Sequence, residues 1–135
     1  MFEDFRTKVM TVYSTLHGVA YPAVLVNYPN RINYDPEGQT DPFVIFSIVF
    51  NKTKQLSLGQ RDLQLSGRLL LHYLFRPGTG SKQSAQYSDF ILDKIALRTL
   101  SGIVFQELTP YTDSKLEGWD GTLNVVPFTT QYFNI

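Results

Sequence analysis

The sequence contains no cysteine, and this absence removes two classes of structure. Disulfide bonds need paired thiols and zinc–thiolate centres need cysteine ligands, so neither can stabilise this chain. Histidine is scarce as well: His17 and His72 are the two copies, and they lie far apart in the sequence. Each is expected to be structural or exposed, and we expect no metal site and no cofactor.

An excess of charge of either sign is also absent, because 12 basic and 12 acidic residues cancel. Proteins that grip nucleic acid usually carry a basic excess, since neutralised phosphates supply most of that affinity. Long apolar runs are missing too: no window approaches the roughly 18 residues that span a bilayer. The chain starts Met-Phe-Glu-Asp, without the apolar core of a signal peptide. We therefore expect a soluble protein, made in the cytoplasm, for which neither nucleic acid nor a membrane is the main ligand.

Motifs that mark common active sites are lacking, because neither a Gly-x-Ser-x-Gly elbow nor a phosphate-binding loop occurs. Gly78-Thr79-Gly80 matches half of a dinucleotide fingerprint, but Gln83 stands where the third glycine would be. A sharp turn from a strand into a helix explains these glycines better. We expect a protein that is not an enzyme.

Acidic side chains in two loops leave one catalytic alternative open. Paired carboxylates can hydrolyse glycosides, although solvated loop charges are far commoner. The two groups are Asp35, Glu37 and Asp41, and Asp113, Glu117 and Asp120.

The order of periodic segments predicts one α+β domain over residues 1–135. Phe2, Phe5, Val9 and Tyr13 recur at helical spacing, which predicts a helix over residues 2–16 that ends near Gly18. A second helix is expected over about 81–100, capped by a serine and followed by Gly102. The predicted strands span 23–26, 43–50, 63–75, 103–108 and 123–133. The expected fold is a mainly antiparallel five-stranded sheet with both helices packed on one face, in the order αβββαββ.

That arrangement leaves apolar side chains on the second face of the sheet. Residues 43–50 are apolar on both faces, and the strand 63–75 adds Leu70 and Leu74 to its otherwise polar face. Leaving about six large apolar side chains exposed to water would lose roughly 9–18 kcal/mol of stabilisation, at roughly 1.5–3 kcal/mol for each side chain. Since a domain is stable by only about 5–15 kcal/mol, we expect the face to be covered by copies of the same chain. The alternative cover is the pair of long loops at 27–42 and 51–62.

The candidate interface residues come from the strands and from these loops. Trp119 is either an interface anchor or a lid on one end of the core. The strand candidates are Val44, Phe46, Ile48, Leu70, Leu74 and Trp119, and the loop candidates are Tyr28, Arg31, Tyr34, Leu56, Leu58 and Arg61.

Several short motifs, spread over residues 1–133, resemble the tail terminator-like proteins (minor tail or tail completion proteins) of long-tailed bacteriophages. The strongest is Phe75-Arg76-Pro77-Gly78-Thr79-Gly80, with the loop Gln55-Leu56-Ser57-Leu58-Gly59 upstream of its strand. The others are Asp41-Pro42-Phe43-Val44, Gly67, Gly118-Trp119 and Val126-Pro127-Phe128.

The resemblance implies a structural virion protein that forms a six-subunit ring on the head-proximal end of the tail tube. Such a ring stops tube polymerisation and presents a surface to the head. Its implied partners are further copies of the chain, the major tail tube protein and the head connector protein, while DNA passes through the lumen without specific binding. Neutral net charge suits such a lumen. A head-completion or neck connector protein of the same fold is the nearest alternative, and a small-ligand module with the sheet face as its pocket is another.

Overall fold

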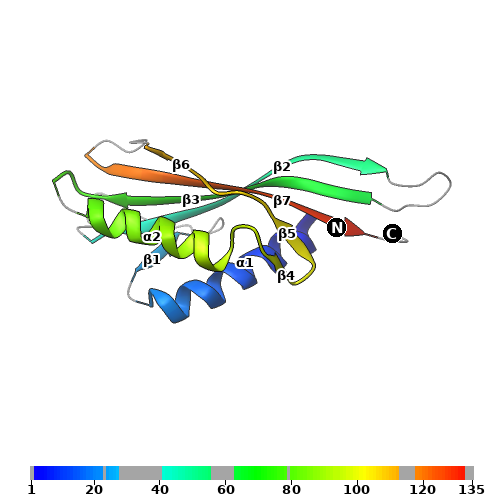
Figure 1. Cartoon of the computed structure of the whole chain (residues 1–135), viewed down its shortest axis with the longest axis horizontal. Coiled ribbons are helices and arrows are strands. Elements are labelled where there is room, and N and C mark those ends of the chain that lie inside the picture. The colour runs from blue at the N-terminus through cyan, green and yellow to red at the C-terminus, as the bar shows by residue number, and fades with distance from the viewer. Residues whose placement is uncertain are drawn as a thin grey trace.

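The computed structural model describes residues 2–22, 24–27, 41–55, 63–78, 80–112 and 118–132. It confirms the α+β class, because two helices pack on one side of a single, mainly antiparallel sheet (Figure 1). The helices are α1 (Phe2–Ala20) and α2 (Ser81–Lys94). The strands are β1 (Leu25–Asn27), β2 (Phe43–Gln55), β3 (Leu63–Phe75), β4 (Thr99–Leu100), β5 (Ile103–Phe105), β6 (Thr109–Thr112) and β7 (Asp120–Tyr132).

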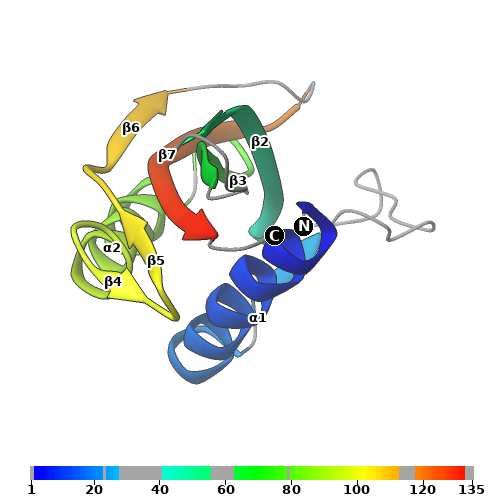
Figure 2. The ribbon, with the colours of Figure 1, turned by 90° about the vertical axis from the view of Figure 1, so that its right-hand side faces the viewer.

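The three long strands β2, β3 and β7 form the centre of the sheet, in the order β1-β2-β3-β7-β5-β4. All pairs are antiparallel except β1 with β2. The short strand β6 also pairs with β7, beyond β5 on the same edge. Figure 2, which looks along the molecule, shows that these strands form a curved layer and that α1 and α2 lie on the same side of it. Relative to the predicted five strands, β4 and β6 are two short additions.

Helix α1 buries one stripe of side chains at four-residue spacing, formed by Phe5, Val9, Tyr13 and His17. This spacing places all four on the face toward the sheet. The helix continues to Ala20, so the prediction that it ends near Gly18 was wrong. Gly18 has helical geometry and open space around it, and the helix stops just before a proline instead.

Helix α2 begins after a glycine turn. Gly78 and Gly80 have φ angles of 80° and 81°, which confirms that these glycines turn β3 into the helix. The helix has no side-chain cap, so the expected capping serine was wrong. Ser81 is the first helical residue, and Ser84 bonds instead to Thr122 of β7, with 2.7 Å between the hydroxyl oxygens.

Helix α2 ends at Lys94, several residues before the predicted end near 100. The backbone leaves helical geometry at Ile95, whose φ is −123°, and Leu97 then adopts a left-handed φ of 58° with 67% of the residue exposed. The chain then forms the hairpin of β4 and β5. Its turn residues Ser101 and Gly102 have φ angles of 51° and 79°, as two-residue hairpin turns commonly require.

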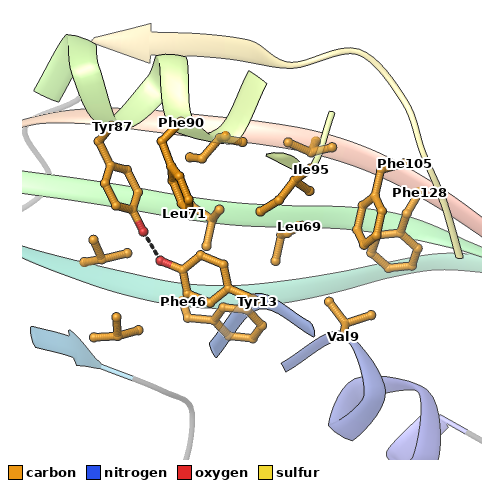
Figure 3. Close-up of a cluster of buried hydrophobic side chains, with 14 of the residues drawn as sticks. Val9, Tyr13, Phe46, Leu69, Leu71, Tyr87, Phe90, Ile95, Phe105 and Phe128 are labelled. Carbon is orange, nitrogen blue, oxygen red and sulfur yellow. Dashed lines mark hydrogen bonds between the residues drawn. The ribbon is translucent and has the colours of Figure 1, made fainter. Parts of the chain in front are cut away.

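The main hydrophobic core lies between the two helices and the sheet (Figure 3). Aromatic rings dominate it: Tyr13 of α1 packs on Phe46 of β2, with ring centroids 5.2 Å apart. Tyr87 of α2 packs on Tyr73 of β3, with centroids 5.0 Å apart. Among the described residues, neither helix has the length and hydropathy needed to cross a membrane.

Candidate functional site

The side of the sheet opposite the helices is the candidate functional surface, and we call it the open face. Strand register defines it as rows of neighbouring side chains that run across β2, β3, β7 and β6. The rows are Phe43–Leu74–Gly121, then Ile45–His72–Leu123–Tyr111, then Ser47–Leu70–Val125–Thr109, and last Val49–Arg68–Pro127.

Apart from His72, which is buried in the second row, the centre of the open face is largely apolar and partly accessible. Ile45, Leu70, Leu123 and Val125 are half-buried, and Val49 is 37% exposed. None of the described rows contains an acidic residue, and Arg68 is exposed among them. Clustered, partly exposed apolar side chains of this kind are typical of surfaces that contact another protein.

One end of the open face is already covered by the chain itself. Trp119 stacks edge-on against Phe43, with ring centroids 4.8 Å apart, and Leu74 completes this second, smaller core. The Arg76 guanidinium lies 4.0 Å from the centre of the Trp119 ring and donates a hydrogen bond to the Gly118 carbonyl, at 3.2 Å. Trp119 is therefore a lid on the core, one of its two predicted roles, and is not exposed as an anchor.

A groove of about 610 Å³ extends the open face along β5. Val104 and Pro127 line it from the sheet, and Leu97 and Glu107 line it from the segments on either side of β5. The Leu97 N–H donates to the Gln106 carbonyl at 3.2 Å, which joins the segment before β4 to the one after β5. The groove therefore presents two exposed aliphatic side chains, Leu97 and Val104, at the margin of the sheet.

Register corrects part of the predicted interface. Val44, Phe46 and Ile48 lie opposite Tyr73, Leu71 and Leu69, which places them on the helix-covered face rather than beside Leu70 and Leu74. Val44 and Phe46 are fully buried there, so neither can contact another subunit in this fold. The prediction grouped the wrong alternate residues of β2 because both sets are apolar.

Of the remaining predictions, Leu70 lies at the centre of the open face and Leu74 is buried at its covered end. The predicted loop residues lie outside the described part of the chain; they are Tyr28, Arg31, Tyr34, Leu56, Leu58 and Arg61. The prediction missed several residues on the open face and on the groove beside it. They alternate with Val44, Phe46 and Ile48 along β2, or lie on β5, β6 and β7. These are Ile45, Val49, Val104, Tyr111, Leu123 and Val125.

A buried polar cluster joins the two helices on the other side of the sheet. The His17 ring accepts a hydrogen bond at Nδ1 from the Tyr87 hydroxyl, at 2.9 Å, and its Nε2 donates to the Val24 carbonyl, at 2.8 Å. The Tyr13 hydroxyl bonds to that of Tyr87 (Figure 3). This arrangement fits neutral imidazole with its proton on Nε2. Burial lowers the pKa of His17 below its ordinary value, although the bond to Val24 opposes this.

The described residues contain no group of three or more histidine, cysteine or acidic side chains that could hold a metal ion. Of the two acidic loop groups, Asp41 and Asp120 are described, and the other four members lie outside the described residues.

No family model matches the chain, and no curated protein matches it in sequence. A solved structure whose name carries no functional information matches 98% of this chain and 97% of its own, with a TM-score of 0.68 and 12% identity. At this identity the likeness shows a shared fold alone.

Proposed function

We propose that this chain is a non-enzymatic assembly protein that forms a closed ring with copies of itself and caps the head-proximal end of a phage tail tube. The apolar centre of the open face supports the self-association. The resemblance of its sequence motifs to tail terminator-like proteins supports the ring of six, the tube and the head connector as partners.

The supporting surface is smaller than the sequence suggested, because the chain covers part of it. Trp119 covers Phe43 and Leu74, and the helices cover Val44 and Phe46. What remains open is the strip that includes Ile45, Leu70, Leu123 and Val125, continued by the groove at Val104. To form a standard interface, this strip and the surface around it would have to bury roughly 800 Å² on each partner. Each Å² of apolar surface that is removed from water contributes roughly 25 cal/mol.

Ring closure requires a heterologous contact, in which the open face of one subunit meets a different surface of the next. Among the described strands at the edges of the sheet, β1 and β4 are only three and two residues long, and β6 contains Pro110, which lacks the N–H that a neighbouring strand would use. β1 pairs with β2 only at Phe43–Ile45, and no other described strand pairs with the rest of that edge of β2. We place the contact on the open face because its apolar centre is partly accessible.

The proposal is tested with purified protein and three variants. Val49→Asp and Leu70→Asp place a carboxylate on the open face, whereas Leu92→Asp places one on the exposed side of α2, where Leu92 is 51% exposed. Light scattering and electron microscopy should show rings for the unmodified chain and for Leu92→Asp, and monomers for the two open-face variants. Added to polymerising tail tube protein, the ring-forming proteins should sit on tube ends and stop growth.

A monomer at all concentrations, with no binding to tube ends, would falsify the proposal. Rings that ignore tubes and instead attach to DNA-filled heads would replace it with the head-completion alternative. Equal loss of rings in all three variants would show that the open face is not the contact surface.

A further inference from the structure

A second apolar surface lies on the helix side of the molecule, where α1 and the hairpin of β4 and β5 run side by side (Figures 1 and 2). It is a groove of about 320 Å³, and its apolar side chains are half-buried. Val19 follows on the same side of α1 and is 83% exposed. We call this surface the α1 groove, and its lining residues are Thr11, Val12, Thr15, Leu16, Leu100 and Ser101.

The α1 groove can be covered at little cost in lost hydration. After Lys8, whose Nζ lies close to Gly102, α1 contains no lysine, arginine or acidic residue. The Thr11 hydroxyl donates to the Thr7 carbonyl at 2.8 Å, and the Thr15 hydroxyl donates to the Thr11 carbonyl at 2.9 Å. Both hydroxyls keep these hydrogen bonds when another surface lies over them. A helix that faces water usually carries charges on its exposed side, so this stretch of α1 is suited to a packed contact.

Exposed charges of opposite sign lie at the same end of the open face and of α1. Arg68 belongs to the last row of the open face, one residue from the partner of Phe128. The start of α1 lies behind this end of the sheet, because Phe5 packs on Phe128 with ring centroids 5.0 Å apart. Asp4 precedes Phe5. Arg68 and Asp4 are both exposed, and neither forms an ion pair with another described residue.

We infer that the α1 groove is the surface on the next subunit that the open face contacts. The inference rests on the proposed function, because it names the second half of the heterologous contact that ring closure requires. Copies that stack in the same orientation, with a rotation between successive copies, place the open face of one over α1 of the next. Arg68 of one copy then lies beside Asp4 of its neighbour, which fixes the direction of stacking.

The apolar parts of the two surfaces match in the same orientation. The middle of α1 lies behind the middle of the sheet, because Tyr13 packs on Phe46, with ring centroids 5.2 Å apart. Phe46 precedes the row of Leu70 by one residue. Stacking in one direction therefore brings the apolar centre of the open face, at Leu70, over the groove that Thr15 lines.

Contacts between identical surfaces explain less. An open face on an open face, or a groove on a groove, is an isologous contact that closes at two subunits. Each such dimer would leave the other apolar surface of both copies in water. The contact of open face with α1 groove covers both surfaces in every subunit of a closed ring, and it is the arrangement that the charges at Arg68 and Asp4 favour.

A charge placed in the α1 groove tests the contact on the whole chain. Thr15→Asp should give monomers in light scattering and electron microscopy, because the open face would then bury a carboxylate. Ser14→Asp is the matched control: Ser14 is exposed, lies one residue earlier on a different side of α1 and does not line the groove, so its rings should persist. Rings in Thr15→Asp would overturn the inference. Rings that no longer stop tube growth would assign the groove to the tube protein instead.

Cross-linking gives a second test that needs no disruptive change, because the chain contains no cysteine. Arg68→Cys and Asp4→Cys are made as separate variants at exposed positions, mixed in equal amounts and treated with a short bis-maleimide. The mixture should give a covalent dimer with one copy of each variant, whereas neither variant alone should. Leu92→Cys, on the exposed side of α2, replaces Asp4→Cys in the control mixture and should not cross-link to Arg68→Cys.

The outcomes separate this inference from the proposed function. Rings in which Asp4→Cys cross-links to Arg68→Cys no better than Leu92→Cys does would overturn the inference and leave the ring intact. Cross-linking of either variant to itself would show an isologous contact and overturn it too. An unmodified chain that forms no ring removes the proposed function and the inference together. If Thr15→Asp does not fold, the cross-linking of the exposed cysteine variants still decides.

Discussion

The ring of Phe128 on β7 lies directly over Gly67 on β3. A Cβ atom at Gly67 would come within 2.8 Å of Phe128 Cζ and within 2.4 Å of the Val49 carbonyl oxygen. The second contact is with backbone, next to the bulge that follows Phe50 in β2. Gly67 therefore allows three strands to approach closely at the bulge, and a side chain there would push them apart.

Gly67→Ala should lower the free energy of unfolding by about 1–3 kcal/mol, the usual cost of adding atoms to a packed interior. Urea unfolding followed by circular dichroism measures the change. Gly18→Ala is the matched control, because nothing lies within 4 Å of the added carbon in α1. The control should be neutral or more stable by up to about 1 kcal/mol, since alanine favours helix. Equal stability of the two variants would contradict the close approach.

Trp119 should be the most costly single truncation on the open face. Removing a buried tryptophan side chain costs about 3–5 kcal/mol, so Trp119→Ala should unfold at much lower urea concentration. Arg76→Met keeps the aliphatic stem but removes both the cation above the ring and the hydrogen bond to the Gly118 carbonyl, which together should cost about 1–2 kcal/mol.

The fluorescence of Trp119, the single tryptophan, gives a second readout of this contact. Arg76→Met should change the emission of the folded protein, whereas Lys82→Met, an exposed change on α2, should leave it unaltered. Identical spectra for all three proteins would show that the cation does not stay over the ring in solution.

The sequence predicted the fold class and the long strand 63–75 with its observed ends, because apolar and polar residues alternate along that strand. It could not orient β2, since Phe43, Val44, Ile45 and Phe46 are apolar at both alternating positions. Only the pairing of β2 with β3, a contact between distant segments, decides which set meets the helices.

The end of α2 shows a second limit of local patterns. Ile95 is buried at helical spacing from Ile91, so the helical pattern continues past the point where the backbone leaves the helix. The turn formed by Ser101 and Gly102 favours a hairpin over a longer helix, because β4 and β5 pair on either side of it. The link between His17 and Tyr87, 70 positions apart, has no local signal at all.

Asn124 should be energetically coupled to Ser88. Its side chain is fully buried, accepts a hydrogen bond from the Ser88 hydroxyl at 2.7 Å and donates one to the Leu71 carbonyl at 3.2 Å. A double-mutant cycle of Ser88→Ala and Asn124→Ala should give a coupling of about 0.5–1.5 kcal/mol. Thr130, which donates to the Gly102 carbonyl and shares no partner with Ser88, provides the control cycle. Thr130→Val with Ser88→Ala should be additive within about 0.5 kcal/mol, and a similar coupling in both cycles would refute the pairing.

Tyr73 should make the protein sensitive to alkali. Burial, and after it the nearby Tyr21, raises the pKa of Tyr73 above its ordinary 10.0, so the unfolded chain loses this phenolic proton before the folded protein does. Stability from this group is complete below pH 10 and is lost as the pH rises through the folded pKa. Tyr73→Phe should therefore lose less stability than the unmodified chain between about pH 9 and 11, measured by urea unfolding. Equal slopes in Tyr73→Phe and the unmodified chain would rule out this role for Tyr73.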